Sequence, residues 1–166
     1  WNSPDPTPWK YVFLDSLCEE TSIPANIKYY SEDGHPKTGV LLVAQDDKFS
    51  SDGGQIVQAT VAKYGVTLLK TIKFNKAEAD LSPYVTQAVQ LKPDVIFITS
   101  LGGIPAKIMT AARKQSWKGQ SLGGHGFNTA PDSNNAGPPS TEPRTPTARD
   151  PGTPMPSHAH LAPVPQ

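Results

Sequence analysis

The chain has 166 residues, a length that suits about one domain. Its 15 basic and 15 acidic side chains balance, so a general electrostatic attraction to nucleic acid or to an anionic membrane surface is missing. The single cysteine, Cys18, excludes an internal disulfide, and the sequence shows neither the ligand spacing of a structural zinc site nor an apolar run long enough for a membrane span.

Proline divides the chain into three parts. Three of the 18 prolines lie in residues 1–8, which we interpret as an irregular N-terminal segment. Ten more lie in residues 129–166, a stretch without aromatic residues and with few large apolar ones. Such a segment buries too little surface to offset an ordering entropy of about 1–2 kcal/mol per residue, so we predict a disordered tail. Residues 9–128 remain as one folded lobe.

The first elements of this lobe are weakly marked. Residues 11–13 (YVF) suggest a short strand, and residues 17–30 suggest a helix. Pro24 lies inside that helix and lacks a backbone N–H, which argues against an uninterrupted helix at this place.

From residue 40 onward, strands and helices alternate clearly. Residues 40–44 (VLLVA) form a continuous apolar run, which predicts a strand covered on both faces. Residues 51–64 carry apolar side chains at helical spacing, and Gly65 supplies a stop signal. Residues 66–74 predict a second strand, which is less apolar and is therefore expected near an edge of the sheet.

The second half of the lobe repeats this alternation. Ser82 can cap a helix whose first residue is Pro83. Residues 95–99 (VIFIT) predict a strand, residues 104–115 a helix, and residues 121–123 a last short strand. The strand and helix order implies right-handed crossovers, and so an α/β fold with a doubly wound parallel sheet.

Any ligand site of such a sheet is expected outside the carboxyl ends of its strands. The corresponding loops are residues 45–51, 75–80, 100–103 and 124–128. The aspartates of the first loop match no metal signature, and we interpret it as a solvated loop in which Ser51 or Asp52 caps the helix. The SLGG turn at residues 100–103 brings backbone N–H groups to a helix start, which favours a carboxylate or phosphate, but it is not a P-loop.

The sequence allows two roles for the Phe49 side chain. An aromatic ring where a strand turns into a helix can stack on a ligand, or it can pack under the helix start as a hydrophobic staple. No serine or cysteine nucleophile has a base partner visible in the sequence, and no cofactor motif is present. We therefore expect a protein that is not an enzyme and that needs no cofactor or metal.

Four segments in order resemble a known family. They are WKYVF (residues 9–13), DDKFSSD (46–52), ADLSPYV (79–85) and KPDVIFITS (92–100). Together they resemble the type I periplasmic solute-binding proteins, specifically the branched-chain amino-acid group that feeds ABC transporters. The resemblance covers residues 9–128, about one lobe of a family that normally has two, and this implies a fragment. The tail resembles nothing in the family, and its composition suggests a shifted reading frame; an intact frame on resequencing would contradict this.

The resemblance implies candidate site residues. Phe49, with Ser50 beside it, matches the aromatic position that packs on the ligand, and Leu101 and Gly102 fall where the family often has another aromatic. His125 falls near an acidic residue that holds the ammonium group in amino-acid binders. A histidine cannot replace that carboxylate, so an amide, an aromatic acid or another small metabolite is as well supported as an aliphatic amino acid. Asp80 and Ser82 match a signature that implies a structural role in capping and holding a loop.

The resemblance implies the substrate-binding component of an ABC importer. Its partners would be a small polar metabolite and a transporter permease, and it would work in the periplasm or outside the cell, at the membrane face of the transporter. Two alternatives remain: a ligand-sensing domain of a receptor or transcriptional regulator with the same fold, and a small flavodoxin-like or hydrolase-like enzyme. The enzyme is the less favoured because the sequence shows no catalytic constellation.

Overall fold

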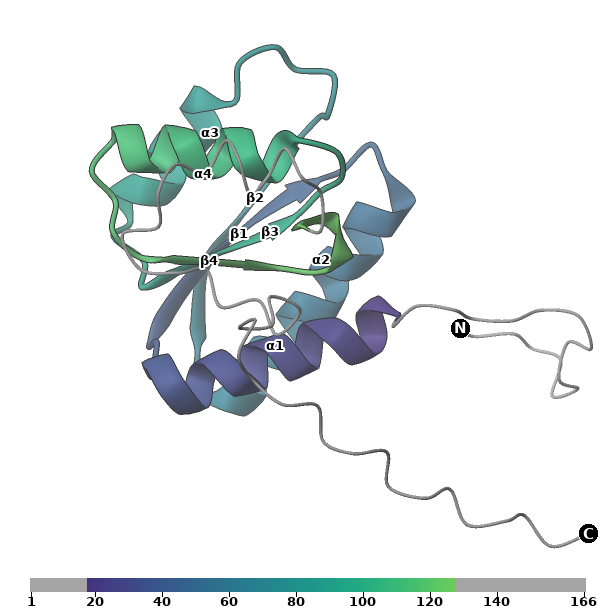
Figure 1. Cartoon of the computed structure of the whole chain (residues 1–166), viewed down its shortest axis with the longest axis vertical. Coiled ribbons are helices and arrows are strands. Elements are labelled where there is room, and N and C mark those ends of the chain that lie inside the picture. Colours follow the sequence, from purple (N-terminus) through teal and green to yellow (C-terminus); the bar gives the residue numbers. More distant parts are fainter. Residues whose placement is uncertain (1–17, 128–166) are drawn as a thin grey trace, which may run out of the picture.

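The computed structural model describes residues 18–127. The expectations for residues 1–8, 11–13 and 129–166 fall outside the described residues. Figure 1 shows one central sheet with helices on both sides. Strand and helix alternate from residue 38 onward, so the predicted α/β fold is confirmed.

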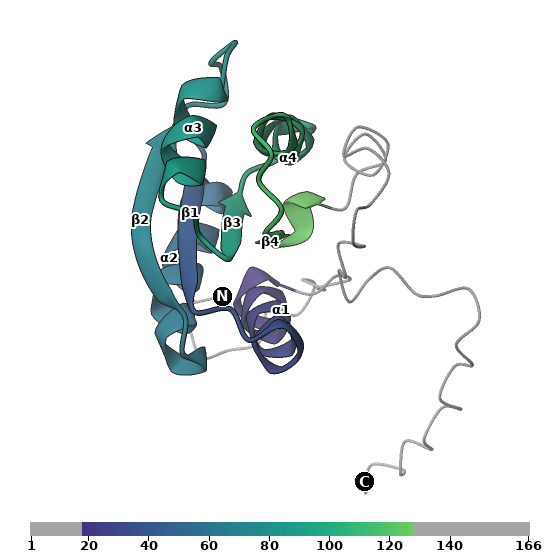
Figure 2. The ribbon, with the colours of Figure 1, turned by 90° about the vertical axis from the view of Figure 1, so that its left-hand side faces the viewer.

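The strands of the described part are all parallel and lie in the order β2-β1-β3-β4, which Figure 2 shows from the side. β1 and β3 are central and nearly fully buried, in agreement with their continuous apolar sequences. β2 lies at one edge with several exposed residues, which confirms the position expected from its mixed composition. The bounds are β1 (Thr38–Ala44), β2 (Thr67–Phe74), β3 (Val95–Thr99) and β4 (Gln120–Gly123).

Two helices cover each face of the sheet, so the sheet is doubly wound (Figure 1). One face carries α1 (Glu19–Gly34) and α2 (Lys48–Val61), and the other carries α3 (Ser82–Gln90) and α4 (Ile104–Lys114). Two short 3-10 turns follow α2 and β4, η1 (Ala62–Tyr64) and η2 (His125–Phe127). Gly65 ends η1 with a φ of 76°, which confirms the predicted stop signal.

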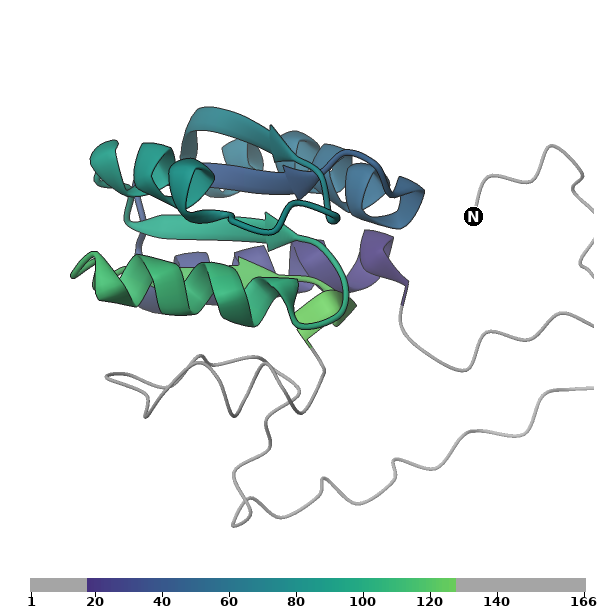
Figure 3. The same ribbon diagram turned by 90° about the horizontal axis from the view of Figure 1, so that it is seen from above.

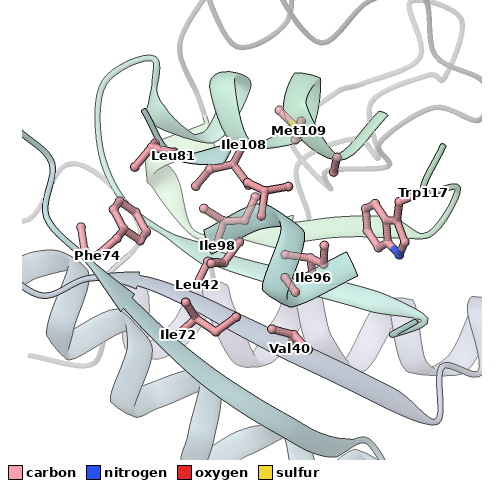
Figure 4. Close-up of a cluster of buried hydrophobic side chains, with 14 residues drawn as sticks. Val40, Leu42, Ile72, Phe74, Leu81, Ile96, Ile98, Ile108, Met109 and Trp117 are labelled. Atoms are coloured by element: carbon pink, nitrogen blue, oxygen red, sulfur yellow. The ribbon is translucent and has the colours of Figure 1, made fainter. Parts of the chain in front are cut away.

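Alternate residues of each central strand pack into two separate hydrophobic cores, one on each face of the sheet. Leu42 and its neighbours two residues away pack with α3 and α4, whereas Leu41 and Val43 pack with α1 and α2. Figure 4 shows the first of these cores, in which Ile96 and Ile98 of β3 lie beside Leu42. Because burying one such side chain contributes about 1.5–3 kcal/mol, these two cores carry the stability of the lobe.

Helix α1 differs from its prediction. It runs from Glu19 to Gly34 without a break at Pro24, and so is longer than the 17–30 segment expected. A proline inside a helix costs about 3 kcal/mol. Ile23 and Ile27, each 2% exposed, bury the inner face of this turn against the sheet. The packing of these two side chains offsets the free-energy cost of the proline, and helix propensity alone does not predict such a tertiary contribution.

Candidate ligand-binding site

The switch point of the sheet lies between β1 and β3. The chain leaves β1 toward α2 on one face, and it leaves β3 toward α4 on the other. Ligands of open parallel sheets bind outside the carboxyl ends of the strands at such a point. Figure 3 shows the strand arrowheads on this side, next to η2 and the start of α1. We define the carboxyl rim as residues 45–50, 100–103 and 124–127.

Asp47 sets the beginning of α2. Its Oδ2 accepts hydrogen bonds from the backbone N–H of Ser50 at 2.9 Å and from the Ser50 hydroxyl at 2.5 Å. These bonds hold the pKa of Asp47 below its ordinary value, chiefly through the Ser50 hydroxyl. The prediction of Ser51 or Asp52 as cap is wrong, because Asp47 has the N-cap spacing to Ser50. Asp52 lies within the helix.

This earlier helix start decides how the first two candidate residues lie. Ser50 is 1% exposed, and its hydroxyl is committed to Asp47. Phe49 lies in the first turn of α2 and is 42% exposed. A staple would be packed under the helix, so the exposed ring favours the interpretation in which Phe49 meets a ligand.

The other carboxylates beside Phe49 have structural partners. Asp46 accepts the backbone N–H of Lys76 at 3.0 Å, and the Lys76 ammonium lies 3.2 Å from Asp47. Asp52 pairs with Lys48 at 2.8 Å. The two contacts of Lys76 join the loops after β1 and β2, and the Lys48–Asp52 pair lies within α2, so the helix start that carries Phe49 has a fixed base. In residues 18–127, no cluster of His, Cys, Asp or Glu side chains is suited to a metal ion.

The turn after β3 places Leu101 and Gly102 at the rim. Leu101 is 36% exposed. Gly102 has a φ of +54°, a left-handed conformation that favours glycine. The first turn of α4 offers fewer free donors than SLGG suggests, because Ile104 donates to the Gly102 carbonyl and Pro105 has no N–H. The expected carboxylate or phosphate preference therefore gains little support from this turn.

Two buried hydroxyls lie where β3 ends. Thr99 and Ser100 are 5% and 3% exposed, and neither hydroxyl has a hydrogen-bond partner in residues 18–127. Thr99 packs against Gly53 and Gly54 of α2, where a Cβ at Gly54 would lie 3.4 Å from the Thr99 hydroxyl. The two glycines thus allow α2 to pack closely over the end of β3.

The loop after β4 brings together residues that are far apart in the sequence. His125 is half-buried in η2, and its backbone N–H donates to Oε1 of Glu19 at 2.7 Å. Gly126 packs against the carbonyl of Ser100 and lies near Leu101. The rim is therefore continuous from Leu101 to His125, and we include Glu19 in it because its carboxylate contacts His125. The sequence did not point to Glu19, because no local signal links it to a residue 106 positions away.

Asp80 and Ser82 lie away from the rim, at the start of α3. Oδ1 of Asp80 accepts the backbone N–H of Ser82 at 2.9 Å, and hydrogen bonds from Ser82 lower the pKa of Asp80. Leu81 occupies the N-cap position, so the prediction that Ser82 caps the helix is wrong. Both residues line a hollow of about 550 Å³ between α3 and α4.

A larger hollow, of about 670 Å³, opens at the amino ends of the strands. Its wall includes Trp117 and Asp94, whose polar atoms are already used. The indole N–H of Trp117 donates to the Pro93 carbonyl at 3.0 Å, and Asp94 accepts bonds from Lys37 and Thr38. We place the site at the carboxyl rim, because there the exposed apolar side chains coincide with the switch point.

Comparison with known proteins gives one family and one fold. The family model described as periplasmic binding protein matches residues 19–151, which continues past residue 128. No curated protein sequence matches the chain. Among the described helices, none has the length and apolarity that a bilayer crossing requires.

Solved structures share the fold at low sequence identity. A leucine binding protein from Thermotoga maritima has a TM-score of 0.66 at 20% identity, over 72% of this chain and 34% of its own. A branched-chain amino acid transporter substrate binding protein from Streptococcus pneumoniae, in complex with isoleucine, gives 0.63 at 19%, over 72% and 33%. A solute binding protein of an R. palustris ABC transporter, in complex with benzoate, gives 0.62 at 15%, over 72% and 32%. This chain spans about a third of the length of each.

Proposed function

Because the chain belongs to the periplasmic binding protein family, we propose that it is a ligand-binding lobe of a substrate-binding protein that serves an ABC importer. The observation that carries the proposal is the exposure of Phe49 and Leu101 at the switch point of the sheet. Exposed apolar side chains on a fixed base suit one wall of a ligand cleft. The second wall would come from another lobe, which closes on the ligand by a hinge motion.

The ligand that we propose is an amino acid, an amide or a related small polar metabolite. Similar structures divide into two ligand classes, because isoleucine carries an ammonium group and benzoate does not. The Phe49 ring would contact the apolar part of either class. Transfer would follow in the periplasm or outside the cell, where the whole protein would deliver its ligand to a permease.

A panel of ligands tests this function on the 166-residue chain. Saturation-transfer NMR would compare L-isoleucine, L-glutamine and benzoate. We expect weak, millimolar binding of at least one of them, because one wall of a cleft makes only part of the contacts. Micromolar affinity would contradict the two-lobe mechanism, and failure of the whole panel would contradict the proposed ligand class.

Phe49→Ala with a matched control locates the contact. We expect this substitution to weaken binding of the selected ligand severalfold. Tyr29→Ala removes an aromatic ring of similar exposure, 45% against 42%, from the surface of α1 and should leave binding unchanged. Equal effects of the two substitutions would place the ligand elsewhere.

A further inference from the structure

The proposed function leaves open whether the ligand carries an amine. We propose that Glu19 is the cation-binding group of the carboxyl rim, and hence that the ligand carries a protonated amine. This inference rests on the proposed function, because it assigns a ligand class to the same site. The presence of His125 left ligands without an amine equally well supported, and a carboxylate at Glu19 shifts the preference to ligands with one.

Glu19 lies at the start of α1, beside the loop after β4. α1 begins at the carboxyl end of the sheet, and the Glu19 carboxylate reaches the first residue of η2 through the His125 N–H. Gly124 makes this approach possible, because a Cβ there would overlap the Glu19 carboxylate. Asn26 supports the same contact from the next turns of α1, since its side-chain amide donates to the Gly123 carbonyl at 3.1 Å.

Within residues 18–127, no cation compensates the charge of Glu19. By contrast, Asp47 and Asp52 near this rim each have an ammonium partner, at 3.2 Å from Lys76 and 2.8 Å from Lys48. Glu19 accepts one hydrogen bond, at Oε1, and its Oε2 has no donor among the described residues. An ionised carboxylate can accept about four hydrogen bonds.

The Glu19 carboxylate is partly shielded from solvent and shares the rim with an apolar side chain. Glu19 is half-buried, so a pair that it formed with an ammonium group would be less screened than a pair on the open surface. Through His125 and Gly126 it is continuous with the exposed Leu101. An apolar contact and an unneutralised carboxylate on one rim fit an apolar molecule with an amine.

Three probes of one carbon skeleton separate the two ends of such a ligand. They are L-leucine, 3-methylbutylamine, which lacks the carboxylate, and 4-methylpentanoate, which lacks the amine. Each would be titrated into the ¹⁵N-labelled chain while the backbone amides of the rim are followed. We expect leucine and the amine to bind, with shifts at His125. Absence of binding by the amine overturns the assignment to Glu19.

Glu19→Gln isolates the charge from the structural contact. Glutamine keeps a carbonyl oxygen that accepts the His125 N–H, but it carries no negative charge. We expect about tenfold weaker binding of leucine and the amine, with 4-methylpentanoate unchanged. Glu20→Gln removes the same charge from the same helix turn and should leave the binding of all three probes unchanged. Equal losses for all three probes, or equal effects of the two variants, overturn the proposal.

The proposal and the proposed function can fail separately. If 4-methylpentanoate binds and the amine does not, the Glu19 assignment fails while ligand binding by the rim stands. If no probe binds, the Glu19 assignment fails, and the panel of isoleucine, glutamine and benzoate decides the proposed function.

Discussion

The two ends of the sheet are built differently. At the amino end, Oδ2 of Asp94 accepts three hydrogen bonds from Lys37 and Thr38, and Trp117 is buried with its N–H bonded to Pro93. At the carboxyl end, Phe49 and Leu101 are exposed. The amino end therefore contributes mainly to stability, and the carboxyl end keeps groups that a ligand can use.

The parallel fold explains this difference. Each helix runs antiparallel to the strands, so helices begin at the carboxyl end and finish at the amino end. The amino end collects the left-handed residues that follow helices, His35, Lys92 and Ser116, with φ of 44°, 50° and 62°. The carboxyl end collects the helix starts, where short loops can vary without disturbing either core.

The largest effect should come from removing an aromatic ring at the amino end. Trp117 is 7% exposed, belongs to the core beneath α3 and α4, and has Arg113 over its ring at 5.5 Å. Trp117→Ala should lower the free energy of unfolding by about 3–5 kcal/mol. Urea denaturation followed by circular dichroism measures this. A loss below about 1 kcal/mol would contradict the structural role of this end.

A smaller loss should follow from Asp94→Ala. The substitution removes the acceptor that joins the start of β1 to the start of β3. One hydrogen bond to a charged group contributes about 1.5–3 kcal/mol. Three such bonds are lost, but Asp94 is exposed and water replaces part of the network, so we expect the total loss to be about that of one bond. Asp94→Asn, which keeps one carbonyl acceptor, should lose less in the same denaturation experiment.

Acid should remove the same contribution without any substitution. The N–H groups of Lys37 and Thr38 hold the pKa of Asp94 below its ordinary value. A depressed carboxyl pKa stabilises the folded state above the unfolded pKa, and this stabilisation is lost as the pH falls through the folded pKa. The difference in unfolding free energy between wild type and Asp94→Asn should therefore shrink below about pH 4. A constant difference down to pH 2 would be inconsistent with this network.

The smallest change in stability should come from the carboxyl rim. Phe49→Ala removes an aromatic ring that is 42% exposed and outside both cores. We expect the free energy of unfolding to change by no more than about 0.5 kcal/mol, although ligand binding weakens. A loss as large as that of Trp117→Ala would show that Phe49 is part of the fold, and the contrast between the two ends would disappear.

The sequence predicted the sheet better than the site. Apolar runs such as residues 40–44 and 95–99 need no distant information, because strands covered on both faces have few other solutions. The prediction of the α2 cap failed because five residues with capping side chains, Asp46, Asp47 and residues 50–52, compete within one short stretch. The helix break expected at Pro24 is absent because the packing of Ile23 and Ile27 outweighs the local cost of a proline inside a helix.

Contacts between distant residues were beyond prediction. Phe49, Leu101 and Gly102 follow strands, so strand positions alone place them at the carboxyl end. Glu19 follows no strand of the described sheet, and its contact with His125 depends on how α1 packs against the end of β4. The residues that follow strands are therefore predictable from the sequence, whereas Glu19, the group that we propose selects the ligand, is not.

Mapping of backbone amide shifts shows whether the ligand binds at the carboxyl rim. The ¹⁵N-labelled chain would be titrated with whichever ligand of the panel binds. We predict the largest shifts at Phe49, Leu101, Gly102 and His125, with the amides around Trp117 and Lys92 unchanged. Shifts concentrated in the hollow at the amino end would contradict this account.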